Sequence, residues 1–270
     1  MIDRAEPRPP HFVLTVMDRK PLKLWCANPG DLEAEGVEEA CAALLNDEEH
    51  ARVARFKFER HRRESLATRA LARTALSRYR ETAAGEWQFT SNRQGKPAVD
   101  PECGLSFNLS NSPGLVVCLV AEGVAEVGVD VESWERAKQI MELVPRVFSA
   151  REQEQLAELP DVEKLDRALS LWTLKESYIK ARGLGLSIPL DEFSFVFSRA
   201  KGITLEIDER LGDDAGRWRF CQLDYAGHRI AVMVDRSVAG ALEVWVARPV
   251  LAEPVRVDVG EVRWFPMDVC

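Results

Sequence analysis

The sequence lacks the cysteine and histidine patterns that mark disulfide-bonded or zinc-binding proteins. Its 270 residues include six Cys that are widely spaced and form no C-x-x-C pair: Cys26, Cys41, Cys103, Cys118, Cys221 and Cys270. The four His residues show no metal-ligand spacing. Disulfides persist in oxidising compartments, and the first residues lack the basic and apolar regions of a secretory signal. We therefore expect six reduced thiols in a cytoplasmic protein.

Long apolar runs and an excess of positive charge are also missing. No uncharged stretch is long enough to span a bilayer, so we expect no membrane association. Lys and Arg number 36 against 44 Asp and Glu, which gives a net charge of −8 at pH 7. A chain of this charge is not expected to bind nucleic acid. Neither a Walker-type Gly-Lys-Ser/Thr loop nor a dinucleotide-binding glycine fingerprint is present.

The positive charge that is present gathers in residues 52–80. Against Glu59 and Glu64, this segment carries ten basic residues: Arg52, Arg55, Lys57, Arg60, Arg62, Arg63, Arg69, Arg73, Arg78 and Arg80. A solvated helix face accounts for such a run. An anion-binding surface for a polyphosphate or for an acidic partner protein accounts for it equally well.

A helix predicted over about residues 166–182 carries a carboxylate on an apolar stripe. At about 100° per residue, Glu176 falls among the apolar residues Leu165, Ala168, Leu169, Trp172 and Ile179. A second apolar stripe lies behind, which indicates an interior helix. Burying a carboxylate without a partner destabilises the folded protein by roughly several kcal/mol. Glu176 is therefore protonated, paired with a cation or in a wet cleft, unless it simply pairs with Lys180 on a solvated face.

A predicted strand over residues 124–132 supplies two more carboxylates. Val127, Val129 and Val131 alternate with Asp130 and Glu132, so the two acids share one face. A half-exposed antiparallel strand shows the same alternation without any function. Three carboxylates without His or paired Cys would form an oxygen-only site, which suits Mg²⁺ with substrate phosphates and not zinc.

These motifs belong to an ordered set. Gly95-Lys-Pro97, Phe107-Asn-Leu-Ser110, Gly128-Val-Asp-Val-Glu132, Phe148-Ser-Ala-Arg-Glu152, Trp172-Thr-Leu-Lys-Glu-Ser-Tyr-Ile-Lys180 and Gly183-Leu-Gly-Leu-Ser-Ile-Pro189 follow one another along the chain. The set resembles the 4′-phosphopantetheinyl transferases of the Sfp type, over roughly residues 52–197. The resemblance implies an enzyme that moves the 4′-phosphopantetheine arm of coenzyme A to a Ser of an apo acyl or peptidyl carrier protein. Such carriers serve fatty-acid, polyketide and nonribosomal peptide synthesis.

The resemblance also implies roles for individual residues. Asp130, Glu132 and Glu176 would hold Mg²⁺, and Glu176 would act as the base, with Lys180 as a second catalytic group. Lys175 and Lys180 resemble phosphate-contacting lysines. Lys96, Ser110 and Asn111 match positions that hold the nucleotide end of coenzyme A, and Arg52 and Arg69 are further candidate phosphate contacts.

Position 111 departs from the family pattern. The family usually has Ser-His-Ser where this chain has Ser110-Asn-Ser112, and that His contacts the 3′-phosphate end of coenzyme A. Because Asn carries no positive charge, the departure puts the preference for the 3′-phosphate in question. A chain that only binds coenzyme A or a carrier protein is the alternative that this departure leaves open. An unrelated Mg²⁺ phosphotransferase or hydrolase would explain the carboxylates but not the ordered motifs.

Helices followed by strands occur twice along the chain. We therefore expect an α+β fold of two similar halves, residues 1–125 and 126–248, with the metal site in the second. The resemblance implies a pseudo-twofold arrangement with the active site in the cleft between the halves. Residues 249–270 form a tail to which the sequence assigns no role, and we expect a monomer.

Overall fold

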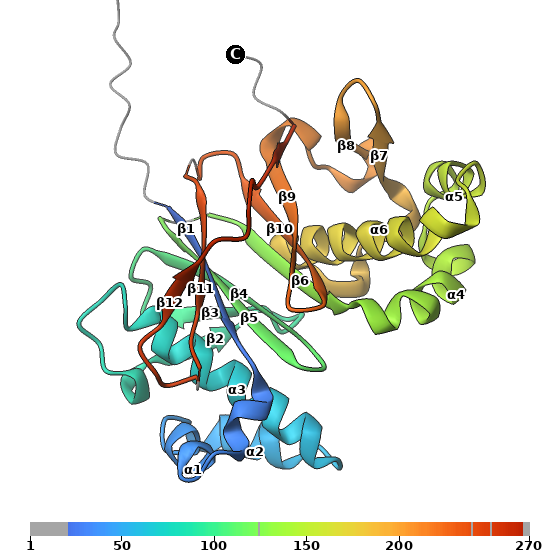
Figure 1. Ribbon diagram of the computed structural model, residues 1–270. Helices are drawn as coiled ribbons and strands as arrows, with labels where there is room; N and C mark the ends of the chain where they lie inside the picture. The colour runs from blue at the N-terminus through green and yellow to red at the C-terminus, as the bar shows by residue number, and fades with distance from the viewer. Residues whose placement is uncertain (1–20, 124, 239, 249, 267–270) are drawn as a thin grey trace, which may run out of the picture.

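The computed structural model describes residues 21–266 apart from residues 124, 239 and 249 (Figure 1). Short apolar runs in residues 15–26 also predict strands, and this segment lies partly outside the described residues, as do both ends of the chain. No helix in the described ranges has both the length and the apolar character needed to cross a membrane. The five Cys residues within them are free thiols.

Each half of the chain repeats one order of elements: a strand, three helices, a two-stranded hairpin and two long antiparallel strands. The first half contains β1 (Leu22–Ala27), α1 (Val37–Ala42), α2 (Asp47–Ala54), α3 (Glu59–Leu76), β2 (Gln88–Ser91), β3 (Pro97–Asp100), β4 (Leu105–Ser112) and β5 (Leu115–Glu122). The second contains β6 (Val127–Ser133), α4 (Ala137–Val147), α5 (Ala150–Ala157), α6 (Asp161–Arg182), β7 (Phe193–Ser198), β8 (Gly202–Ile207), β9 (Trp218–Tyr225) and β10 (His228–Asp235). The predicted α+β fold of two similar halves is confirmed.

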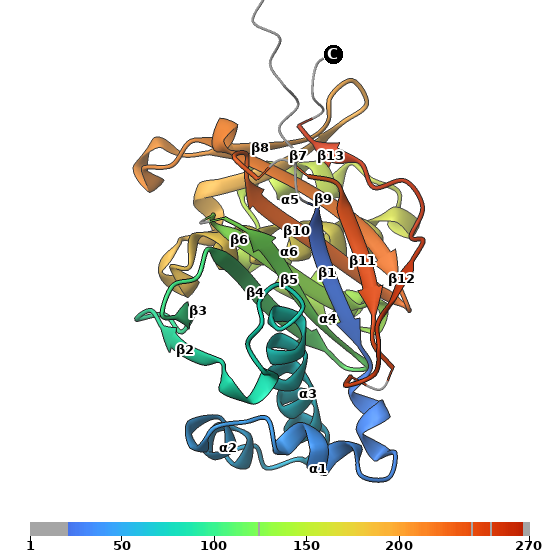
Figure 2. The same ribbon diagram turned by 90° about the vertical axis from the view of Figure 1, so that its left-hand side faces the viewer.

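Strand pairing repeats in the same way. One sheet has the order β12-β11-β1-β5-β4 and the other β13-β9-β10-β6, so β1-β5-β4 corresponds to β6-β10-β9. Three later strands complete the sheets: β11 (Leu242–Val246) runs parallel to β1, β12 (Val255–Val257) pairs with β11, and β13 (Trp264–Phe265) pairs with β9. The segment after residue 248 therefore extends both sheets. Strand β11, which the sequence division places in the second half, joins the sheet of the first (Figure 2).

The two sheets pack face to face, with helices on their outer sides (Figure 1). Alternate residues of β5 serve the two layers: Val116 and Cys118 pack with α3, whereas Val117 and Leu119 lie between the sheets. In β6 the valines face the layer between the sheets. Every residue of β6 is buried, so its opposite, acidic face lies beneath α6 and not in solvent. This burial excludes a half-exposed strand.

Local signals define the ends of the helices around the site. Ser149 and Glu152 have the spacing that predicts a capping box, and they form one at the start of α5. Gly183, the first glycine after the helix predicted over residues 166–182, ends α6 in the left-handed conformation with a φ of 64°. Short 3-10 helices link the other elements: Pro29–Glu33, Ala84–Glu86, Trp134–Arg136, Gly185–Ser187, Leu190–Glu192, Glu209–Leu211 and Ala215–Arg217.

Candidate active site

Side chains of β4 fasten the first half to β6 of the second half. The N–H groups of Val129, Val131 and Ser133 donate to Asn108 Oδ1, Ser110 Oγ and Ser112 Oγ at 2.9, 3.3 and 3.0 Å. These acceptors are alternate residues of β4 and therefore share one face. Asn108, Ser110 and Ser112 thus form a row of side-chain acceptors, the acceptor ladder, which aligns β4 with β6.

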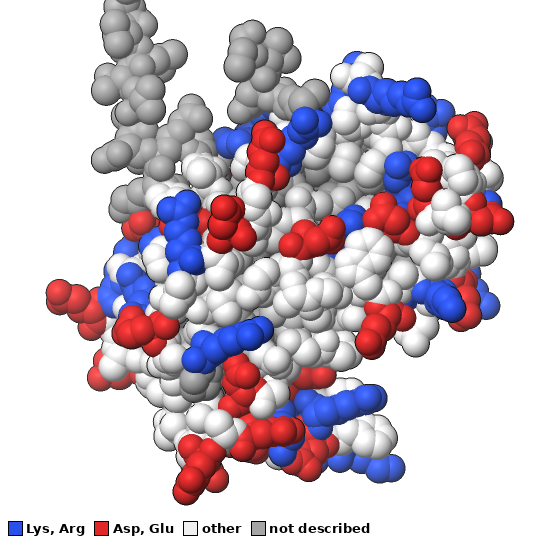
Figure 3. Space-filling model, in the orientation of Figure 1, with Lys and Arg blue, Asp and Glu red and all other residues white. Residues whose placement is uncertain are grey.

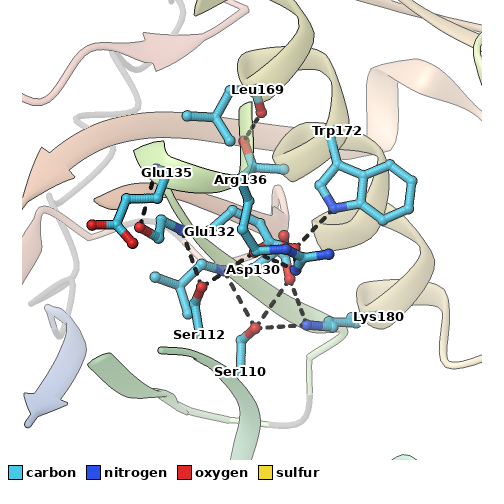
Figure 4. Close-up of polar contacts among 12 residues, drawn as sticks. Ser110, Ser112, Asp130, Glu132, Glu135, Arg136, Leu169, Trp172 and Lys180 are labelled. Atoms are coloured by element: carbon cyan, nitrogen blue, oxygen red, sulfur yellow. Dashed lines mark hydrogen bonds and ion pairs between the residues drawn. The ribbon is translucent and has the colours of Figure 1, made fainter. Parts of the chain in front are cut away.

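Asp130 lies at the centre of the polar cluster in Figure 4 and is 4% exposed. Its Oδ1 accepts hydrogen bonds from Ser110 Oγ at 3.0 Å and Lys180 Nζ at 2.7 Å. Its Oδ2 is buried and has no hydrogen-bond partner. A buried carboxylate oxygen without a partner is costly, so this atom is available to a cation.

Both carboxylate oxygens of Glu132 have partners, unlike those of Asp130. Arg136 Nη1 lies 2.5 Å from its Oε1, and Trp172 Nε1 donates to the same oxygen at 3.1 Å. Ser112 Oγ donates to Oε2 at 3.2 Å (Figure 4). Burial and the nearby Asp130 nevertheless raise the pKa of Glu132. Arg136, Trp172 and Ser112 were not predicted as members of the site. The helical i,i+4 rule does not indicate Arg136, because Glu132 belongs to strand β6.

Glu176 reaches a cleft from α6. This cleft of about 280 Å³ is lined by Glu176, Lys180 and Asn108 together with residues of the Gly95-Lys-Pro97 segment. Burial, and secondly the charge of Asp130, raise the pKa of Glu176 to about 7, although Lys180 lowers it. Glu176 and Lys180 are both half-buried in this cleft, and Lys180 forms its ion pair with Asp130. A carboxyl that titrates near neutral pH in a cleft is suited to proton transfer.

Close contact between β6 and α6 fixes this geometry. A Cβ added to Gly128 would lie 2.1 Å from Ser177 O and 2.5 Å from Ala181 N. Only Gly at this position lets the strand backbone touch the helix backbone. The approach places Asp130, two residues along β6, within reach of Lys180 on α6.

The predicted phosphate contact of Lys175 is wrong. Lys175 is fully buried, and its Nζ lies 2.7 Å from Glu152 Oε2 and donates to Phe193 O at 2.7 Å. Burial lowers the pKa of Lys175, while Glu152 raises it. The side chain is about 100° around α6 from Glu176 and faces α5 and β7, not the cleft. Sequence could not separate the two directions because α6 is buried on most sides.

Lys96 lines the cleft, and the side chains of both Lys96 and Ser110 are already bonded within the protein. Lys96 Nζ donates to Val127 O at 3.0 Å and Ala181 O at 2.7 Å, and burial lowers its pKa to about 8. Its stem lies against Gly183. Ser110 is 6% exposed and its hydroxyl belongs to the carboxylate cluster. The structure thus places Ser110 with the carboxylates, and Lys96 joins the β2–β3 hairpin to the second half.

The other predicted nucleotide contacts line a second cleft. Arg52, Arg69 and Asn111 surround a space of about 430 Å³, together with Phe56, His61, Glu64, Ser65 and Thr68. Burial, and secondly the charge of Arg52, lower the pKa of Arg69. Two guanidinium groups in one cleft favour an anion. Because Asn108 and Asn111 both belong to β4, this strand borders both clefts.

The residues provide oxygen donors that suit a divalent cation, but they are not yet arranged as a complete metal site. In the part of the chain that the structure describes, no three acidic, His or Cys side chains are already arranged to hold a metal. Lys180 and Arg136 occupy oxygens of Asp130 and Glu132 instead. The unpartnered Oδ2 of Asp130 and the carboxylate of Glu176 are oxygen donors of the kind that Mg²⁺ prefers.

Comparisons with known proteins identify the family of this chain. A family profile described as "4'-phosphopantetheinyl transferase superfamily" matches residues 126–233, and one described as "4'-phosphopantetheinyl transferase, N-terminal" matches residues 35–123. The 4'-phosphopantetheinyl transferase HetI of Nostoc sp. is 36% identical over 184 residues, which cover 67% of this chain and 75% of that protein.

Two further relatives extend the comparison. The 4'-phosphopantetheinyl transferase Sfp of Bacillus subtilis is 29% identical over 168 residues, 62% of this chain and 73% of that protein. A phosphopantetheinyl transferase of Thraustochytrium sp. is 31% identical over 210 residues, 73% of this chain and 72% of that protein. The chain belongs to the 4′-phosphopantetheinyl transferase superfamily.

Proposed function

We propose that this transferase works with Mg²⁺ and uses Glu176 as its general base. It moves the 4′-phosphopantetheine arm of coenzyme A to a Ser hydroxyl of an apo carrier protein. The observation that carries the proposal is the carboxyl of Glu176, whose pKa of about 7 and place in the cleft suit proton transfer. A module that only binds coenzyme A is not favoured, since Asp130, Glu176 and Lys180 remain together.

The reaction forms a bond between the Ser oxygen and the phosphorus of the phosphopantetheine arm. It breaks the pyrophosphate bond, so that adenosine 3′,5′-bisphosphate leaves. The ionised Glu176 takes the Ser proton during the attack. Lys180 supplies positive charge beside the cluster, with its Nζ 2.7 Å from Asp130 Oδ1. The guanidinium groups of Arg52 and Arg69 orient the nucleotide end in the second cleft.

Asp130 and Glu176 would hold the metal, which supplies charge neutralisation on the pyrophosphate. Glu132 fits a supporting place better, because Arg136, Trp172 and Ser112 already engage its oxygens. Its negative charge keeps the cluster attractive to a cation. Glu132 becomes a direct ligand only if Arg136 moves away.

The carrier protein is proposed to dock on the basic surface of residues 55–62, next to the cleft of Arg52 and Arg69. On the face shown in Figure 3, basic side chains lie beside the loop that joins α2 and α3, with acidic ones interspersed. Phe56 and Phe58 in this loop are 40% and 57% exposed. An acidic carrier with an apolar patch suits such a surface. We further infer a cytoplasmic monomer, in keeping with the free thiols.

Mass spectrometry of purified apo acyl and peptidyl carriers, incubated with coenzyme A and Mg²⁺, tests the function. We expect a gain of one phosphopantetheine on at least one carrier, and none with chelator. Glu176→Gln keeps the size of the side chain and removes its basicity, so the rate should fall by about 10²–10⁴-fold.

Glu163→Gln is the matched control, because it makes the same change at an exposed position of α6. It should transfer at the wild-type rate. If Glu176→Gln kept activity within about threefold of wild type at saturating Mg²⁺, Glu176 would not be the base. Transfer that continued unchanged in chelator would remove Mg²⁺ from the proposal.

A further inference from the structure

Arg219 on β9 is a buried guanidinium without a counterion. It is 9% exposed, and its Nε is buried with no hydrogen-bond partner. In the described ranges no carboxylate forms an ion pair with it. Arg217, two residues earlier, is different: its guanidinium lies 2.9 Å from Glu126 Oε2 and 2.7 Å from Asp235 Oδ2. Arg217 is thus paired, whereas Arg219 has no such partner among the described residues.

The position of Arg219 makes its charge costly. Trp218 and Phe220 pack with α6, whereas Cys221 and Leu223 lie in the apolar layer between the sheets. Strand alternation therefore directs Arg219 to the edge of that layer. Its Cζ lies 4.7 Å from the centroid of the Trp264 ring, a favourable contact that gives the buried Nε–H no hydrogen-bond acceptor. A buried charge of this kind is normally paired.

An open space lies beside this guanidinium. Arg219 lines a cleft of about 430 Å³ with Gly240, Ala241, Leu242, Gly260, Val262 and Trp264. No acidic side chain is among these residues, and Gly240 and Gly260 contribute only backbone to its wall. The cleft shares no residue with the two clefts of the transferase site. It is therefore separate from the catalytic machinery.

We propose that Arg219 and this cleft bind an oxyanion, a carboxylate or phosphate group that pairs with the guanidinium. The planar N–H fork of Arg fits both groups in a bidentate manner, and the ring of Trp264 holds the guanidinium in place. The source is a free anion in solution.

The first test compares melting temperatures of wild type and Arg219→Met in Good's buffer with and without inorganic phosphate, at constant ionic strength. For a free anion, the wild-type Tm should rise by about 3–6 °C at a phosphate concentration tenfold above Kd. Arg219→Met should show only the smaller rise that comes from the cleft of Arg52 and Arg69. Without phosphate it should be at least as stable as wild type, because an unpaired buried charge has been removed.

Two controls keep this test decisive. Arg217→Met removes a paired guanidinium, so its Tm should fall by the same amount with and without phosphate. Arg219→Lys keeps the charge but not the fork, and it should respond to phosphate less than wild type does. If Arg219→Met does not fold, Arg219→Gln takes its place in every comparison, because it also removes the charge.

The proposal is overturned if wild type and Arg219→Met respond equally to phosphate. The second test measures transferase activity. Transferase activity of Arg219→Met should equal that of wild type, which separates this site from the proposed function.

Discussion

At the scale of single residues, Glu176 links the stability of the protein to pH. Its pKa is raised from 4.5 to about 7, chiefly by burial. Between these values the unfolded chain loses the proton first, so stability falls as pH rises and the full penalty is present above pH 7. Glu176→Gln lacks this penalty. In chelator, its Tm should equal that of wild type near pH 4.5 and exceed it at pH 8 by about 2–4 °C.

Thermal unfolding across pH 4.5–8, with Glu163→Gln as the reference, measures this difference. Mg²⁺ should shrink the difference at pH 8, because a bound cation favours the ionised carboxylate. A constant difference at every pH would show that Glu176 titrates normally. A difference that Mg²⁺ leaves unchanged would show that Glu176 does not contact the metal.

Asn111 gives a prediction about the choice of coenzyme. It is exposed in the cleft of Arg52 and Arg69, where the family usually has His. A charge-assisted hydrogen bond is worth about 1.5–3 kcal/mol and a neutral one about 0.5–1.5 kcal/mol. Asn111→His should therefore increase the preference for coenzyme A over its 3′-dephospho form by at most about tenfold. The increase should grow as pH falls through about 6.5.

The kcat/KM values for both cofactors, measured on wild type and Asn111→His from pH 5.5 to 8, decide the point. The two guanidinium groups already supply charge in the cleft, so wild type should retain some preference for the 3′-phosphate. An unchanged preference in Asn111→His at every pH would mean that residue 111 does not contact the 3′-phosphate.

At the scale of elements, the contact between β6 and α6 holds the carboxylates together. Gly128→Ala would place a Cβ against backbone atoms of Ser177 and Ala181, which cannot rotate away. Separating the strand from the helix should cost about 1–3 kcal/mol or more. Urea unfolding measures this loss. Gly85→Ala is the control, because nothing lies within 4 Å of its added Cβ and its stability should be close to that of wild type.

The same two elements show what sequence can predict. The alternation of residues 127–132 and the 3.6-residue period of 166–182 gave the right elements, and Gly183 gave the end of the helix. The clustering of Asp130 and Lys180 was not derivable from local patterns. It depends on Gly128 and on the acceptor ladder of β4, which act between elements distant in sequence.

Other elements were less visible in the sequence. Apolar residues at helical spacing over residues 37–79 predict helix there, and the structure divides this segment into α1, α2 and α3, with Asn46 as the N-cap of α2. The sequence marks residues 92–97 as a turn, whereas strand β3 begins at Pro97. The burial of Arg219 was also not predicted, because it follows from the pairing of β9 with β13 and not from the neighbours of Arg219 in sequence.

At the scale of the whole molecule, the repeat of strand, helices, hairpin and strands explains where the site forms. The strands β4 and β6 meet at the junction of the halves through side chains of Asn108, Ser110 and Ser112. Carboxylates from the second half and the arginine cleft of the first half are thereby brought to the same strand, β4. The later strands β11 and β13 each extend a different sheet, so the segment after residue 241 holds the halves together.

The charge of the whole chain bears on docking of the carrier. A net charge of −8 repels an acidic partner at long range, so attraction must come from the basic loop. Arg62 donates to Phe56 O and Lys57 O and is better left intact. Arg55→Glu with Lys57→Glu should raise the KM for the carrier about tenfold or more and leave the KM for coenzyme A close to wild type.

Arg199→Glu with Lys201→Glu is the matched control, since it makes the same charge change at exposed positions of the β7–β8 turn. Long-range repulsion alone would raise the KM equally in both double variants, whereas local docking would raise it only in the first. The wild-type rate at low carrier concentration should also fall with salt, because exposed charges are screened over about 10 Å at 0.1 M. A rate that does not depend on salt, with equal KM values in the two variants, would assign docking to Phe56 and Phe58 instead.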